Sequence, residues 1–183
     1  MDIKNAQADM RYGYLGGAAG LFASATVWLA AGVAAAAGSA KGAVVVLFVG
    51  GMLIHPLAVL ACKLAGRPGA HVKENPLGAL ALESTVILLL GVLLALGLAQ
   101  FRVELFFPAM LLVIGGRYLV FQTLYGRRVY WICGGVLAAL GMAAAMLKLP
   151  VPATALAGGV TEVVFGALVL SRHRREGTAG PNP

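Results

Sequence analysis

The chain has 183 residues, of which 60% are hydrophobic and 11% charged, and its net charge is +7. An average soluble domain contains about 25% charged residues, so this composition excludes an ordinary soluble protein and favours an integral membrane protein. Spanning helices of about 20 apolar residues use nearly the whole chain and leave no room for a soluble catalytic domain.

Six apolar runs bounded by charge, glycine or proline predict an all-α integral membrane bundle of six transmembrane helices. The predicted spans are 12–38, 42–64, 76–100, 104–126, 129–149 and 151–170. They form one transmembrane domain, 12–170, between an N-terminal segment, 1–11, and a C-terminal tail, 171–183, which we expect to be solvated and mobile. Short links make successive helices antiparallel neighbours, and only the link 65–75 is long.

Basic residues indicate the orientation of these spans. Ten of them lie on one side, in or next to the N-terminal segment, the second and fourth links and the tail, whereas only Lys41, Arg102 and Lys148 lie at the helix ends on the opposite side. The positive-inside rule therefore places both termini in the cytoplasm. Six spans with this topology can be two inverted three-helix halves, as in many transporters. The match that supports this is a glutamate on the third span of each half.

Four ionisable residues lie inside the apolar runs: His55, Glu83, Arg117 and Glu162. Charge at the bilayer centre costs about 2.5 to 3.5 kcal/mol per residue, so such groups usually face the bundle interior and pair there. All four lie eight to ten residues from the predicted cytoplasmic helix ends, which is about 12 to 15 Å at the rise of an α-helix. This common depth permits the four residues to meet.

Three interpretations of these four residues are open: a proton or ion path, a structural clamp, and separate contacts that are unrelated to one another. Arg117 can hold one carboxylate ionised and leave the other as a proton carrier, for which we favour Glu83 because Ser84 and Thr85 follow it. Alternatively, Arg117 bridges Glu83 and Glu162 and only fixes helix packing. We expect Arg117 to pair with at least one of the two glutamates, since an unpaired guanidinium at that depth is costly.

A helical stripe beside Arg117 consists of Tyr118, Gln122 and Tyr125. It suits either a polar cavity or an interfacial anchor. The predicted substrate or proton path therefore contains His55, Glu83, Arg117, Glu162, Tyr118 and Gln122.

Glycine spacing predicts close helix contacts. Glu162 shares a helix face with Gly158, Gly159 and Gly166, so we expect this face to point into the bundle. Two overlapping GxxxG spacings begin at Gly13 and Gly16, and they suit packing within the bundle or between protomers.

The expected partners are the lipid bilayer, an unknown small solute or ion, and a second copy in a homo-oligomer, but no nucleic acid. Anionic lipid headgroups are candidates for five basic residues that topology also explains: Arg127, Arg128, Arg172, Arg174 and Arg175. The chain lacks a serine in a GxSxG motif and a histidine-rich metal set. We therefore expect no metal and no cofactor, and an intramembrane enzyme ranks third among the functions considered, after a transporter and a structural or partner-binding protein.

Several segments resemble a family of uncharacterised bacterial multi-pass membrane proteins, a domain of unknown function. The similar segments, within residues 55–126, are HPLA from His55, NPLG from Asn75, FPA from Phe107, GGRYLVF from Gly115 and LYG from Leu124. The resemblance implies a six-helix bundle in a bacterial inner membrane, with no known activity. From the residues, we predict a small transporter- or channel-like protein, proton-coupled through its polar centre. The alternative is a non-transporting structural or partner-binding membrane protein.

Overall fold

A computed structural model describes residues 1–178, and all regular elements in that range are helical. Six spans are long and apolar enough to cross a membrane, which confirms the predicted all-α bundle. The long helices are α2 (Ala18–Ala36), α3 (Ala40–Leu64), α4 (Leu77–Phe101), α5 (Phe106–Tyr125), α6 (Val129–Leu147) and α7 (Val151–Thr178). A further helix, α1 (Ile3–Gly13), precedes them, and the single turns η1 (Leu15–Gly17) and η2 (Val103–Leu105) lead into α2 and α5.

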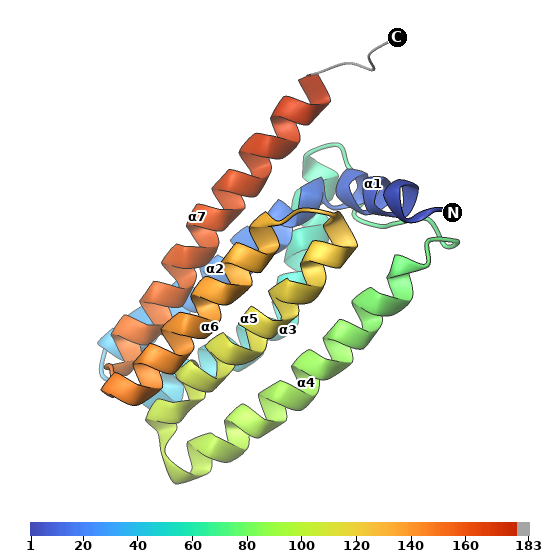
Figure 1. Ribbon diagram of the computed structural model, residues 1–183. Helices are drawn as coiled ribbons and strands as arrows, with labels where there is room; N and C mark the ends of the chain where they lie inside the picture. Colours follow the sequence, from blue (N-terminus) through green and yellow to red (C-terminus); the bar gives the residue numbers. More distant parts are fainter. Residues whose placement is uncertain (179–183) are drawn as a thin grey trace.

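The long helices run side by side, and α1 lies across one end of them (Figure 1). This end also contains the links 65–76 and 126–128, and we call it the basic end. Helix α7 extends past it, so the predicted mobile tail is helical as far as Thr178. The remainder of the tail, 179–183, lies outside the described residues.

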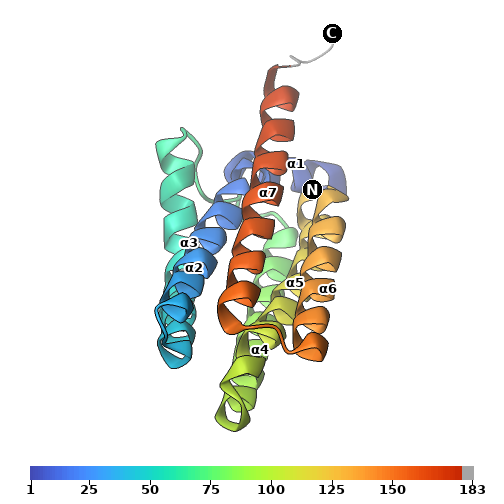
Figure 2. The same cartoon turned by 90° about the vertical axis from the view of Figure 1, so that its left-hand side faces the viewer.

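The bundle has tightly packed inner helices and two sparsely covered outer ones. The most extensive contacts join α2 to α7 and α5 to α6, whereas α3 packs on α2 and α4 packs on α5 (Figure 2). Over the most apolar 18-residue window of each span, 56% of the residues are buried in η1 and α2, but only 11% in α3 and 17% in α4. Most of the surface of α3 and α4 is therefore open to the bilayer.

One predicted pair of neighbours is wrong. Helices α3 and α4 follow each other in the chain but make little contact, because the long link between them lets each pack on a different partner.

The predicted first span begins later than expected, because the chain turns between α1 and α2. Leu15, Gly16 and Gly17 have φ angles of 54°, 64° and 91°, in the left-handed region that favours glycine. The Tyr130 hydroxyl donates to the Gly16 carbonyl at 2.5 Å, and a Cβ at Gly17 would overlap this hydroxyl. The GxxxG spacings are thus not on one continuous helix, but Gly13, Gly16 and Gly17 each make a close contact within the bundle, which is one of the two uses predicted for them.

Helix α1 is held at the basic end by polar contacts. The Asn75 side chain donates to the Ala6 carbonyl at 3.0 Å and to Asp9 Oδ2 at 2.7 Å. Gln7 donates to the Thr123 carbonyl and Arg11 to the Tyr125 carbonyl, each at 2.8 Å. The N-terminal segment is therefore a docked helix.

A further contact at the basic end joins Tyr14 to the long link. Burial raises the pKa of the Tyr14 hydroxyl above its ordinary value. A tyrosine hydroxyl keeps its proton at neutral pH even without this shift, so it can donate to His71 Nδ1, 3.1 Å away.

Candidate functional site

The structure separates the four ionisable residues of the predicted centre. His55 on α3 and Glu83 on α4 are exposed, Arg117 on α5 is half-buried, and Glu162 on α7 is fully buried. In residues 1–178 no ion pair joins any two of them. Arg102 and Glu104 form an ion pair at 4.0 Å, at the end of the bundle opposite the basic end. The four residues of the predicted centre share a depth but point in different directions.

Glu162 lies at the contact between α7 and α2. Its glycine face points into the bundle as predicted, because Gly158 contacts Trp28 and Gly159 contacts Leu29, both on α2. A side chain at either glycine would collide with these residues, so the two helices approach closely only with glycine there.

The Glu162 carboxyl group has neutral polar neighbours. The Tyr118 hydroxyl donates to Oε1 at 2.7 Å, and Ser24 on α2 is near enough to interact with the same group. Oε2 accepts no hydrogen bond from the described residues. A buried carboxylate that no cation neutralises is costly. The Oε2 atom of Glu162 can still accept a hydrogen bond or contact a cation.

The tyrosines of the predicted stripe lie in an aromatic cluster near Glu162. The rings of Tyr118 and Tyr125 both stack on Tyr130, with centroids 6.1 and 5.3 Å away, and Phe121 packs edge-on to all three. Gln122 is half-buried on the same helix. The cluster fills the space between α5 and α6 instead of lining a polar cavity.

Arg117 lies between α4 and α5. Its Nη2 donates to the Thr85 hydroxyl at 3.2 Å, and its guanidinium carbon is 5.4 Å from the centroid of the Phe121 ring. The predicted pairing of Arg117 with Glu83 or Glu162 is therefore wrong in this structure. Residues two apart on a helix do not share a face, so an arginine that reaches Thr85 is directed away from Glu83.

A shallow groove runs along the outside of the α4 and α5 pair. We call it the α4–α5 groove, and it is lined by Ser84, Ile87, Leu90, Gly91, Leu94, Leu112, Val113, Gly116, Arg117 and Val120. Arg117 is the charged residue among them. Its guanidinium has five N–H donors, and one of its nitrogens is engaged by Thr85.

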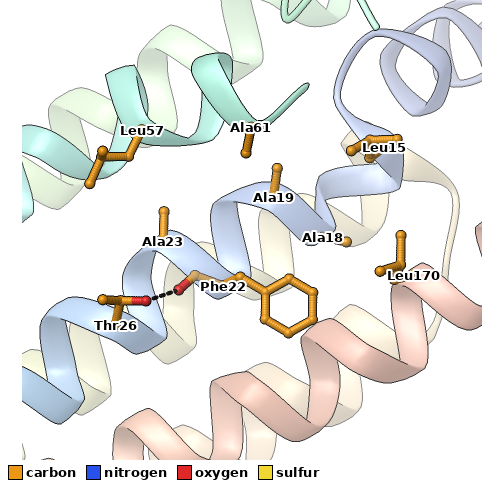
Figure 3. Close-up of a pocket in the computed structure, with 9 residues that line it drawn as sticks. All are labelled: Leu15, Ala18, Ala19, Phe22, Ala23, Thr26, Leu57, Ala61 and Leu170. Carbon is orange, nitrogen blue, oxygen red and sulfur yellow. Dashed lines mark hydrogen bonds between the residues drawn. The ribbon is translucent and has the colours of Figure 1, made fainter. Parts of the chain in front are cut away.

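A second groove lies between α2, α3 and α7 (Figure 3). Its lining residues are Leu15, Ala18, Ala19, Phe22, Ala23, Thr26, Leu57, Ala61 and Leu170. The hydroxyl of Thr26 donates to the Phe22 carbonyl at 2.9 Å, so it offers little to a polar ligand. Neither groove is lined by Glu162, Tyr118 or Gln122.

The five basic residues suggested for lipid headgroups differ in exposure. Arg127 is only 8% exposed, and its Nη1 donates to the Val169 carbonyl at 3.3 Å. The other four are exposed: Arg128, Arg172, Arg174 and Arg175. Arg127 therefore joins α7 to the start of α6, and headgroup binding stays a prediction for the set.

Sequence reasoning did not predict the contacts of four polar residues that the structure uses: Ser24, Asn75, Thr85 and Tyr130. Asn75 had a readable signal, because an asparagine just before a proline and an apolar run is a typical helix cap. Its Oδ1 indeed accepts from the Leu77 backbone nitrogen at 2.9 Å. The direction of the other three depends on helix rotation, which their spacing does not reveal.

Comparison with known proteins gives one match. The model of a family of unknown function (DUF7010) matches residues 3–172, well beyond the segment 55–126 in which the resemblance was found. No curated protein and no solved structure matches the chain.

Proposed function

This chain belongs to a family of unknown function (DUF7010), and we propose that it is a partner-binding membrane protein. The observation that carries the proposal is the outward position of Glu83 and Arg117. Both lie well inside apolar helices, yet Glu83 is exposed and Arg117 opens onto a groove facing the bilayer.

The cost of these positions supports the proposal. Each charge near the bilayer centre is disfavoured by about 3 kcal/mol unless it finds a partner or water. The described part of the chain supplies Arg117 with a hydroxyl and Glu83 with no hydrogen bond or ion pair. A protein partner that covers this face would supply the missing opposite charges.

We also propose that the basic end faces the cytoplasm of a bacterium and that the protein lies in the inner membrane. The unequal distribution of basic residues supports this orientation. A cysteine introduced at Gly69, in the link between α3 and α4, should resist an impermeant thiol reagent in intact cells. Labelling at that site would contradict the proposed orientation and place the basic end outside the cytoplasm.

Photo-crosslinking tests partner binding. Benzoylphenylalanine at Leu94, in the α4–α5 groove, should form a protein adduct in native membranes, whereas the same residue at Ile132 on α6 should react with lipid. The two positions are 72% and 61% exposed, so accessibility is matched. Lipid adducts alone at Leu94 would contradict the proposal.

Glu162 favours a second candidate function, proton- or ion-coupled transport. The specific observation is its buried, unbonded Oε2, which can hold a proton or contact a cation. Glu162→Gln should then abolish a pH-driven flux in reconstituted vesicles while Glu104→Gln, at the far end, retains it. An absence of flux in the unmodified protein would remove this candidate.

A further inference from the structure

We propose that the groove between α2, α3 and α7, which we call the α2–α3–α7 groove, holds one acyl chain of an anionic phospholipid whose phosphate contacts Arg174. The inference goes beyond the proposed function, because this site is formed by other helices and shares no lining residue with the α4–α5 groove. Four properties support it: the chemistry of the lining, the shape of the groove, its length and the charge at its basic end.

The lining of the α2–α3–α7 groove suits a hydrocarbon chain. Eight of its nine lining residues are apolar, and Thr26 is the polar one. The Thr26 hydroxyl already donates to the Phe22 carbonyl of its own helix, so it requires no hydrogen bond from an occupant. An apolar occupant therefore leaves no polar lining group unsatisfied.

The groove is open along its side. Helix α2 packs against both α3 and α7, whereas α3 and α7 make almost no contact with each other, so α2 is the floor and the other two helices are the walls (Figure 2). The side chains of Ala19 and Ala23 on the floor are small and face α3 (Figure 3). Thr26 and Leu57 are exposed at the inner end of the groove, so a lipid chain can enter from the bilayer.

The length of the groove favours a lipid chain over a helix of a partner protein. The lining residues of α2 extend from Ala18 to Thr26, which is about 12 Å of helix, and Leu15 lengthens the groove at its basic end. One leaflet of the hydrocarbon core is about 15 Å deep, whereas a spanning helix needs a surface of about 30 Å. The groove therefore matches one acyl chain in the leaflet beside the basic end.

Arg174 lies where the phosphate of such a lipid would be. Leu170 lines the groove, and Arg174 is four residues nearer the basic end on the same face of α7. Four residues of helix rise about 6 Å, which carries Arg174 beyond the apolar lining. Its side chain is exposed, and a guanidinium can bind a phosphate through two parallel hydrogen bonds. Arg172 and Arg175 are two and five residues from Leu170, so they lie on other faces.

Photoreactive lipids provide the main test. The full-length protein is reconstituted in phosphatidylcholine nanodiscs that contain a trace of phosphatidylglycerol or phosphatidylcholine with the same diazirine-bearing acyl chain. Adducts are mapped by peptide mass spectrometry. The anionic lipid should label Phe22 and Leu57 about fivefold more than the zwitterionic lipid does, since one arginine near the headgroup supplies that preference.

Ile132 on α6 is the internal control for this labelling. It is 61% exposed and Leu57 is 44% exposed, so both are accessible to lipid, but Ile132 lines neither groove. The two lipids should label Ile132 equally. Equal labelling of Leu57 by the two lipids, or the same preference at Ile132, would overturn the inference.

An arginine pair tests the headgroup contact. Arg174→Gln should lower labelling of the groove by the anionic lipid about fivefold, the contribution of one basic residue near an anionic headgroup, and should leave labelling by the zwitterionic lipid unchanged. Arg172→Gln is the matched control, because Arg172 is equally exposed but lies on another face of α7. Equal losses in the two variants would show a general attraction of charge and contradict a defined site.

An alanine pair tests the acyl chain. Ala23→Leu should lower labelling by the anionic lipid about fivefold, because the added side chain occupies the groove. Ala30→Leu is the control, since Ala30 lies two turns further along the same face of α2 and does not line the groove. Equal labelling of the two variants would contradict occupation of the groove. If Ala23→Leu does not fold, the arginine pair decides.

Soluble glycerol phosphate distinguishes a lipid from a free phosphate. An excess of it should leave the labelling of Phe22 and Leu57 unchanged, because it lacks the acyl chain that fills the groove. Loss of the labelling would show that the phosphate contact alone makes the site, and it would overturn the inference. None of these outcomes changes the expected crosslink at Leu94, which lies on α4.

Discussion

The contacts of Glu162 and Arg117 are alike in chemistry and opposite in setting. In each, an ionisable side chain at intramembrane depth is bonded to a hydroxyl of a neighbouring helix: Tyr118 for Glu162 and Thr85 for Arg117. Glu162 is enclosed by α2, α5 and α7, whereas Arg117 opens onto the outer groove. Depth is thus a poor guide to role, and the direction of the side chain decides what it can bind.

The largest expected effect contrasts two adjacent glycines of α5. A Cβ at Gly115 would lie 2.7 Å from the Gly134 carbonyl oxygen and 3.0 Å from the Ala138 nitrogen, both backbone atoms of α6. Gly115→Val should lower the free energy of unfolding by about 3 kcal/mol, because backbone cannot easily move aside. Gly116→Val faces outward and should change it by less than about 0.5 kcal/mol. Denaturant titration in detergent micelles measures both, and equal effects would contradict the inner–outer division.

The next contrast replaces one glutamate in each region. Glu162→Leu should destabilise the fold by about 2 kcal/mol, because it leaves the buried Tyr118 hydroxyl without its acceptor. Glu83→Leu should change stability by less than about 0.5 kcal/mol, since Glu83 is exposed and makes no such bond. The same titration on detergent-diluted monomer reports both values. A larger loss for Glu83→Leu would reverse the assignment of inner and outer residues.

Removing the Tyr118 hydroxyl tests the buried contact between Tyr118 and Glu162 directly. Tyr118→Phe should cost about 1.5 kcal/mol, because Glu162 loses the hydrogen bond to its Oε1. In a Glu162→Leu background the same change should cost much less, and this difference is the coupling between the two residues. Tyr12→Phe, at an exposed tyrosine, serves as the control. Additive effects at Tyr118 and Glu162 would show that their contact contributes nothing.

The smallest expected effect concerns Arg117 and Glu83 within one chain. Because no ion pair joins them, Arg117→Leu and Glu83→Leu should be additive in the monomer, with a coupling below about 0.5 kcal/mol. The double-mutant cycle is measured under conditions that keep copies apart. Strong coupling there would mean that Arg117 leaves Thr85 and reaches its own glutamate.

The sequence was sufficient for the spans and for the direction of one ionisable residue. Hydropathy identifies six helices because each must bury about 20 apolar residues in the bilayer. The three glycines around Glu162 correctly predict its inward direction, since only a close helix contact requires small residues on one face.

The sequence did not show in which direction the polar side chains of the outer helices α3 and α4 point. Apolar residues surround α4 on all sides, so the pattern carries no preferred face for Glu83. Ser84 and Thr85 suggested a water route, yet both hydroxyls donate to the Ala81 carbonyl, each at 2.9 Å. The turn at 14–17 was missed because glycines in an apolar run also suit a continuous membrane helix.

The docking of α1 constrains the order in which the protein can be completed during biosynthesis. Gln7 and Arg11 leave the ribosome early, but their acceptors are the carbonyls of Thr123 and Tyr125, more than a hundred residues later. Contacts of such long sequence separation can form only after the intervening chain is in place. The first helix to be synthesised must therefore wait until four spans have emerged before it reaches its final position.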